Sequence, residues 1–215
     1  MSPSTGEPGR LGPGPGRPRR LGRLGPGQLL DEVTLTGDLS GADGTDARLI
    51  DCVIEDADLS GVRLRGARIT DTRLRAVRGT GLELPSSEWL DCTLEGTRLG
   101  AVAMYGATWR RVRVVGGKIE FLNARGARLR EVAFEDCVLV EPDFGAAVMK
   151  DVTFDGCRLV TPDFTQAELT GVDLSGADLI SPQGIPSLRG ASISRLQLLD
   201  LAPALATQLG ITVRD

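Results

Sequence analysis

The chain has 215 residues, a formal net charge of −4 at pH 7 and no histidine. The absence of histidine excludes histidine-based acid–base catalysis, nucleophiles activated by histidine, and metal sites that use histidine ligands. We therefore expect no enzymatic activity, no cofactor and no bound metal, and no apolar run is long enough to predict a membrane-spanning helix.

Residues 1–28 differ in composition from the rest of the chain. The first 30 residues hold eight glycines, six prolines and five arginines against one acid, Glu7. Such a segment has little to bury, so we predict a disordered, weakly basic tail. It lacks the apolar core of roughly 7–15 residues that marks a secretory signal, and we expect a cytoplasmic protein. The tail is open to two interpretations, a contact with nucleic acid or membrane, or a solvated leader or start-site artefact, and the second is favoured.

A strict five-residue period runs from Leu49 to Leu179. Every fifth residue is apolar, apart from Gly79, and the residue two positions earlier is small or apolar, as in Ala57-Asp58-Leu59-Ser60-Gly61. Neither a helix, with its 3.6-residue period, nor a half-buried strand, with its period of two, gives this spacing. A fixed period indicates a repeat architecture in which two residues of each five point inward.

The unit resembles the motif A(D/N)LXX of the pentapeptide-repeat family, over about residues 37–181. The resemblance implies an all-β fold, a right-handed, four-sided β-helix with four units per coil. The sequence supports the same coil independently, because the segments that begin at Cys137, Cys157 and Ala177 match one another at a spacing of 20 residues. We therefore predict a β-helix over residues 29–183, with about seven coils and a length of roughly 30 Å.

All four cysteines occupy the small inward position of the repeat. They are Cys52, Cys92, Cys137 and Cys157. We interpret them as core residues with free thiols, although Cys137 and Cys157 stack on adjacent coils.

The five-residue period ends after about Gly184, and residues 184–215 predict a short α-helical C-terminal cap. Ser194 is a suitable N-cap, Gly210 a suitable C′ residue, and Pro203 is expected to split the helix in two. Residues 211–213 predict a short strand. The segment resembles the terminal module of the Qnr/MfpA-type quinolone-resistance proteins, which implies that it caps the rod and joins two rods into a homodimer. The apolar residues expected at this interface are Leu198, Leu201, Leu205, Leu209, Ile211 and Val213. A cap on a monomer is the alternative.

The outward carboxylates are unevenly distributed over the predicted sides. One corner column collects five acids and the adjoining side adds four; we call these nine residues the acidic strip. Its members are Asp51, Asp71, Asp91, Glu131 and Asp151 at the corner, and Glu55, Glu95, Glu135 and Asp155 on the side. Asp56 and Asp136 lie at the far corner of that side, and Arg75 and Arg111 interrupt the columns.

The resemblance to quinolone-resistance proteins implies that the acidic strip imitates DNA. It implies binding to DNA gyrase or another type II topoisomerase, which the protein would modulate or protect from fluoroquinolone-type poisons. The same expectation includes no catalysis and no direct contact with nucleic acid or membrane. The alternative is a protein-interaction scaffold whose partner is unknown and whose surface acids only maintain solubility. An outward apolar column, Val140, Val160 and Ile180, offers a further docking position.

Overall fold

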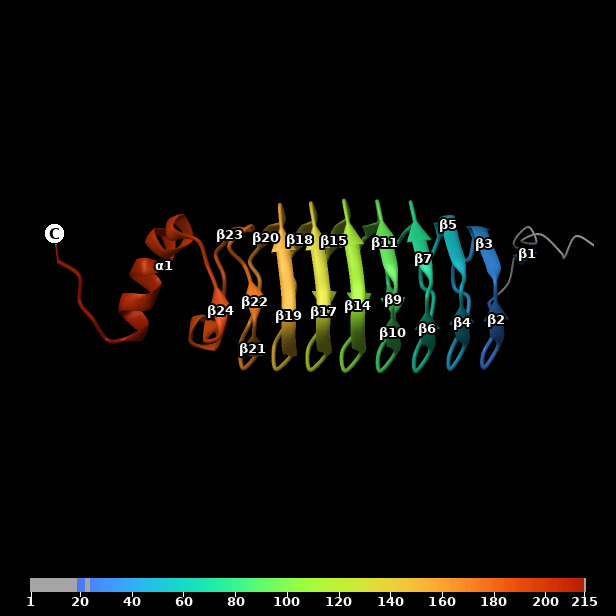
Figure 1. Cartoon of the computed structure of the whole chain (residues 1–215), viewed down its shortest axis with the longest axis horizontal. Helices are drawn as coiled ribbons and strands as arrows, with labels where there is room; N and C mark the ends of the chain where they lie inside the picture. Colours follow the sequence, from blue (N-terminus) through green and yellow to red (C-terminus); the bar gives the residue numbers. More distant parts are fainter. Residues whose placement is uncertain (1–18, 22–23, 215) are drawn as a thin grey trace, which may run out of the picture.

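The computed structural model describes residues 19–21 and 24–214. Parallel strands stack rung upon rung along one long axis, and the α-helix of the described residues lies at the C-terminal end of the rod (Figure 1). Each coil has four sides, and the predicted four-sided β-helix is confirmed. The predictions for residues 1–18 and 22–23 lie outside the described residues.

The strands fall on four sides, which we number in chain order. Side 1 holds β2 (Leu29–Asp31), β4 (Arg48–Ile50), β6 (Arg68–Thr70), β10 (Glu88–Leu90), β21 (Glu168–Thr170) and the first halves of β14 (Thr108–Val115), β17 (Arg128–Glu135) and β19 (Val148–Asp155). Side 2 holds the second halves of those three strands with β3 (Val33–Asp38), β5 (Val53–Asp58), β7 (Arg73–Arg75), β11 (Thr93–Glu95), β22 (Val172–Asp173) and β24 (Ala191–Ser192). The last residues of β3 and β5 turn onto side 3, where Asp58 pairs with Arg78.

The other two sides have shorter strands. Side 3 holds β8 (Arg78–Gly79), β12 (Arg98–Leu99), β15 (Lys118–Glu120), β18 (Val138–Val140), β20 (Arg158–Val160) and β23 (Asp178–Ile180). Side 4 holds β9 (Leu82–Glu83), β13 (Val102–Ala103) and β16 (Leu122–Asn123), continued by isolated bridges such as Asp43 with Arg63.

The rungs pair in register, 20 residues apart, except at the first coil and at the last rung of side 2, where Val172 pairs with Ala191. On side 1 the inward residues stack from Leu49 through Ile69 and Trp89 to Leu169. The first coil is one residue shorter, because Leu30 pairs with Leu49, and β3 absorbs the difference by a register shift at Thr36/Gly37. This coil extends the solenoid to about eight turns, one more than the sequence analysis counted.

A three-residue strand lies within the segment for which we predicted disorder. β1 (Arg19–Leu21) pairs in parallel with β3 at the open N-terminal end of the rod. Backbone pairing on a free strand edge does not require an apolar side chain, so the glycine- and proline-rich composition did not reveal it.

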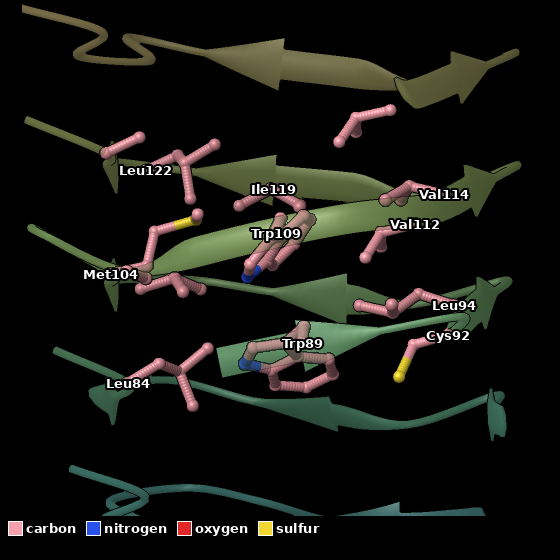
Figure 2. Close-up of a cluster of buried hydrophobic side chains, with 14 of the residues drawn as sticks. Leu84, Trp89, Cys92, Leu94, Met104, Trp109, Val112, Val114, Ile119 and Leu122 are labelled. Carbon is pink, nitrogen blue, oxygen red and sulfur yellow. The ribbon is translucent and has the colours of Figure 1, made fainter. Parts of the chain in front are cut away.

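The core is a continuous stack of apolar side chains along the rod axis. Trp89 lies beneath Trp109 with ring centroids 5.5 Å apart (Figure 2), and Phe134 stacks on Phe154 at 4.9 Å. All four cysteines are buried and free, as predicted, and burial raises the pKa of the Cys92 thiol to about 11. A buried thiol with a raised pKa is unreactive, which suits a packing role.

The C-terminal cap is anchored to the last coil by one glutamine. After the 3₁₀ helix η1 (Ile185–Leu188), the helix α1 (Arg195–Gln208) begins at Ser194, whose hydroxyl accepts from the Gln197 backbone N–H at 3.2 Å. The side chain of Gln197 accepts from the Ser194 N–H at 2.6 Å and donates to the carbonyls of Leu174 and Ala177, both at 2.7 Å. Gln197 therefore satisfies two carbonyls at the end of the rod.

Two predictions for this region are wrong. Pro203 does not split α1, which runs through it. Proline has no N–H to donate to the carbonyl of Leu199, but Leu199 is exposed to solvent, so the helix tolerates this loss. Residues 211–213 form no strand, because they follow the helix beyond the rod and no described strand lies beside them. Gly210 has the predicted left-handed conformation, with the paired bonds of a Schellman motif from Gly210 N–H to Thr207 and from Ile211 N–H to Ala206.

Candidate partner-binding surface

The structure brings the nine residues of the acidic strip together in two neighbouring columns. Asp51, Asp71 and Asp91 share a corner with Glu131 and Asp151, and all five have a left-handed backbone with φ between 49° and 56°. On side 2 the register is Glu55, Arg75, Glu95, Val115, Glu135 and Asp155. Aspartate tolerates a left-handed backbone better than most residues, so the corner favours aspartate for conformational as well as electrostatic reasons.

Four acids of the strip are paired with arginines. Asp91 accepts two bonds from Arg111, each at 2.6 Å, and Glu135 accepts from Arg113 Nε at 2.6 Å. These bonds hold the pKa of both carboxyls below their usual values. Two further pairs complete the set: Arg75 with Glu95 at 3.3 Å and Arg130 with Glu131 at 3.0 Å.

The remaining five acids form two groups separated by these arginines. Asp51, Glu55 and Asp71 lie on the N-terminal coils, and Asp151 and Asp155 lie on the C-terminal coils. None of the five makes an ion pair with another residue in the described part of the chain. The strip is therefore two patches of free carboxylate with a neutralised band between them.

Side 1, on the other flank of the acidic corner, is basic, and its cations were not among the predicted site residues. Arg110, Arg130 and Lys150 stack in register on adjacent coils, with Arg128 beside Arg130. The 20-residue spacing that aligns the acids in the sequence also aligns these cations. Duplex DNA presents phosphate on all sides, whereas this rod is acidic on one side and basic on the next.

The residues expected at a dimer interface lie in two different environments. Leu209 and Val213 are each 74% exposed, Leu198 and Ile211 are also exposed, and Leu205 is half-buried. Leu201 is 6% exposed and packs within its own chain, so its side chain is not available to a partner. Leu196 and Leu199 are exposed as well and were not among the expected residues.

The outward apolar column also stacks in register. Val140 pairs with Val160, and Val160 with Ile180, along β18, β20 and β23 of side 3. All three side chains are half-buried, so they offer little apolar area to a partner.

The described residues contain no cluster of acids or cysteines arranged to hold a metal ion. In the same part of the chain, no helix combines the length and apolar character needed to cross a membrane.

Comparisons with known proteins agree with the repeat. A family model described as pentapeptide repeats matches in 8 copies, over residues 30–71, 45–78 and 147–181. No curated protein matches the chain. Three of the solved structures that match the chain follow, all at low identity and with TM-scores below 0.5.

The first, HetL from the cyanobacterium Nostoc sp. strain PCC 7120, is a pentapeptide-repeat protein involved in the regulation of heterocyst differentiation. It is 20% identical, and the match covers 77% of this chain and 89% of HetL with a TM-score of 0.46. A trypsin-treated form of QnrB1, a plasmid-mediated fluoroquinolone resistance protein, is 15% identical over 86% of this chain and 100% of that one, with a TM-score of 0.41. Rfr23 from the cyanobacterium Cyanothece 51142 is 13% identical over 78% and 89%, with a TM-score of 0.27.

Proposed function

The chain is a pentapeptide-repeat protein, and we propose that it works as a rigid binding rod rather than as an enzyme. Its partner would be a type II topoisomerase such as DNA gyrase, whose DNA-binding surface is basic and would receive the acidic side of the rod. The observation that supports this proposal most is the alignment of free carboxylates in columns. Five acids with no ion pair in the described chain keep their full charge for a partner.

The attraction would be electrostatic and steric. A duplex about 30 Å long carries roughly 18 phosphate charges, and the free carboxylates of the strip supply a fraction of that number. The protein would therefore compete with DNA through a local match of charge along one side. Two rods joined through the exposed leucines of α1 would present two such sides to a two-fold symmetric enzyme.

The test is a supercoiling assay with purified DNA gyrase, with and without a fluoroquinolone. Full-length protein is expected to alter supercoiling or cleavage at micromolar concentration. The variant Asp51→Asn/Glu55→Gln/Asp71→Asn should lose the effect and keep the fold, because asparagine also tolerates the left-handed corner.

A matched control changes acids on other sides of the rod. Asp46→Asn/Glu83→Gln/Glu141→Gln likewise removes two carboxylates at left-handed corner positions and one from a strand, and it should leave the effect intact. If both variants lose the effect equally, only net charge matters and the acidic strip is not the binding surface.

The second candidate is a scaffold for a partner other than a topoisomerase. The band of paired arginines across the acidic strip favours it, because a DNA-like surface would be acidic without interruption. If the full-length protein has no effect in the supercoiling assay, the scaffold function replaces topoisomerase binding as the proposal.

A further inference from the structure

A ladder of cations runs up the outer face of side 1. Arg110 pairs in register with Arg130, and Arg130 with Lys150, on three adjacent coils. Arg128 lies two residues before Arg130 on the middle coil, and all four side chains are exposed. We call these four residues the cation ladder.

Elsewhere on the rod, cations are usually compensated by an acid on a neighbouring coil. Six ion pairs join residues 20 apart. They are Arg63 with Asp43, Arg68 with Glu88, Arg75 with Glu95, Arg78 with Asp58, Arg111 with Asp91, and Arg158 with Asp178. The 20-residue offset is therefore the common way in which this solenoid balances stacked charges.

The cation ladder departs from this rule. Arg110, Arg128 and Lys150 make no ion pair with a described residue, and Arg130 bonds only to its neighbour Glu131 at 3.0 Å. Side 3 carries a comparable stack, Arg78–Arg98–Lys118. Both ends of that stack are in ion pairs, Arg78 with Asp58 and Lys118 with Glu120.

Like charges placed directly opposite each other on neighbouring strands destabilise a sheet. The strand spacing of roughly 4.8 Å brings the three stacked cations close to one another along the axis. Their side chains are exposed, so neither the core nor the backbone turn requires them at these positions. A ligand with repeated negative charge would relieve the repulsion.

We propose that the cation ladder binds the phosphate backbone of duplex DNA. The ladder spans about 10 Å of the rod axis, and a duplex of that length carries roughly six phosphates. Three of the four cations are arginines, whose planar guanidinium group binds phosphate through two parallel hydrogen bonds. The flat strand face presents all of them in one direction.

This proposal differs from the expectation of no direct contact with nucleic acid, and it does not depend on binding to a topoisomerase. The acidic corner beside the ladder limits the contact to one narrow side. The expected interaction is therefore weak, independent of base sequence and strongly dependent on salt.

The experiment measures fluorescence anisotropy of a labelled 20-base-pair duplex titrated with the full chain at several salt concentrations. The logarithm of the binding constant should fall with the logarithm of salt with a slope of about −3 to −4, one phosphate per cation. The variant Arg110→Gln/Arg130→Gln/Lys150→Gln should bind at least about tenfold more weakly at low salt.

The matched control is Arg78→Gln/Arg98→Gln/Lys118→Gln, which removes the same charge from the stack on side 3. The control variant should bind DNA as tightly as the unchanged protein. The N-terminal arginines are the same in the unchanged protein and both variants, so they cannot account for a difference between them. A charge-preserving variant, Arg110→Lys/Arg130→Lys, should retain most of the binding, and circular dichroism checks that each variant folds.

Several results would overturn the proposal. They are no binding of the full chain to DNA at low salt, equal loss in the ladder and control variants, or unchanged binding by the ladder variant. Binding to vesicles of phosphatidylserine but not to DNA would also overturn it, because it would assign the ladder to a membrane surface.

Discussion

One buried indole in this solenoid lacks a hydrogen bond that its neighbour has. The Trp89 Nε1–H donates to Ser87 Oγ at 3.0 Å, and the Ser87 hydroxyl donates to the Leu84 carbonyl at 2.7 Å. One coil further on, Trp109 is 3% exposed, and its Nε1–H has no partner among the described residues. The difference arises two positions before each tryptophan, where Ser87 is replaced by Ala107 (Figure 2 shows both rings).

We predict that Ala107→Ser stabilises the protein by about 1 kcal/mol, because an unsatisfied buried donor costs about 1–3 kcal/mol. The backbone around Ala107 already matches that around Ser87, since Ala107 N–H bonds to Met104 O at 3.0 Å and Ser87 N–H to Leu84 O at 3.2 Å. The new hydroxyl would therefore donate to Met104 O and accept from Trp109, so it would not itself be left unsatisfied.

Equilibrium unfolding in urea, followed by tryptophan fluorescence and circular dichroism, measures the change. A gain of that size corresponds to a rise in Tm of about 2–4 °C for a domain of this length. The converse variant, Ser87→Ala, should lose about 1–3 kcal/mol by orphaning the Trp89 donor. If Ala107→Ser destabilises the protein while Ser87→Ala has no effect, the hydrogen-bond reasoning is wrong.

Three further predictions concern the cap, the charge pairs and the assembly. Gln197→Leu keeps the volume but removes two bonds to the last coil, so amide hydrogen exchange in residues 195–208 should accelerate while the rod is unchanged; equal exchange would contradict the anchoring role. Asp91 has a lowered pKa in the fold, so its pair with Arg111 contributes stability above the ordinary carboxyl pKa of 3.8, and this contribution is lost as the pH falls through the folded value. Arg111→Gln should therefore reduce stability at neutral pH and reduce it progressively less as the pH falls below 3.8, and an equal loss at every pH would refute the assignment. Light scattering should give the mass of two chains for the full-length protein and of one chain for Leu198→Glu, whereas a monomeric full-length protein would rule out the dimer.

The sequence predicted the core because the coil geometry turns every fifth residue toward the interior. A side chain at the central position must fill the narrow interior, so Leu139 or Phe154 has no alternative orientation. The 20-residue spacing then placed the cysteines and the corner acids correctly without any tertiary information.

The remaining features depend on local contacts and backbone details that the repeat period does not determine. Whether Glu135 is free or paired depends on the reach of Arg113 from the neighbouring coil. The shorter first coil depends on a register shift at Thr36/Gly37. The helix through Pro203 depends on the exposure of Leu199, the residue whose carbonyl loses its donor.

Surface plasmon resonance over immobilised DNA gyrase, with and without saturating duplex DNA, tests the acidic side most directly. We predict that the full chain binds the free enzyme, that DNA on the enzyme blocks this binding, and that Asp51→Asn/Glu55→Gln/Asp71→Asn weakens it. Absence of binding, or binding that neither the DNA nor the three amide substitutions alter, would contradict the account.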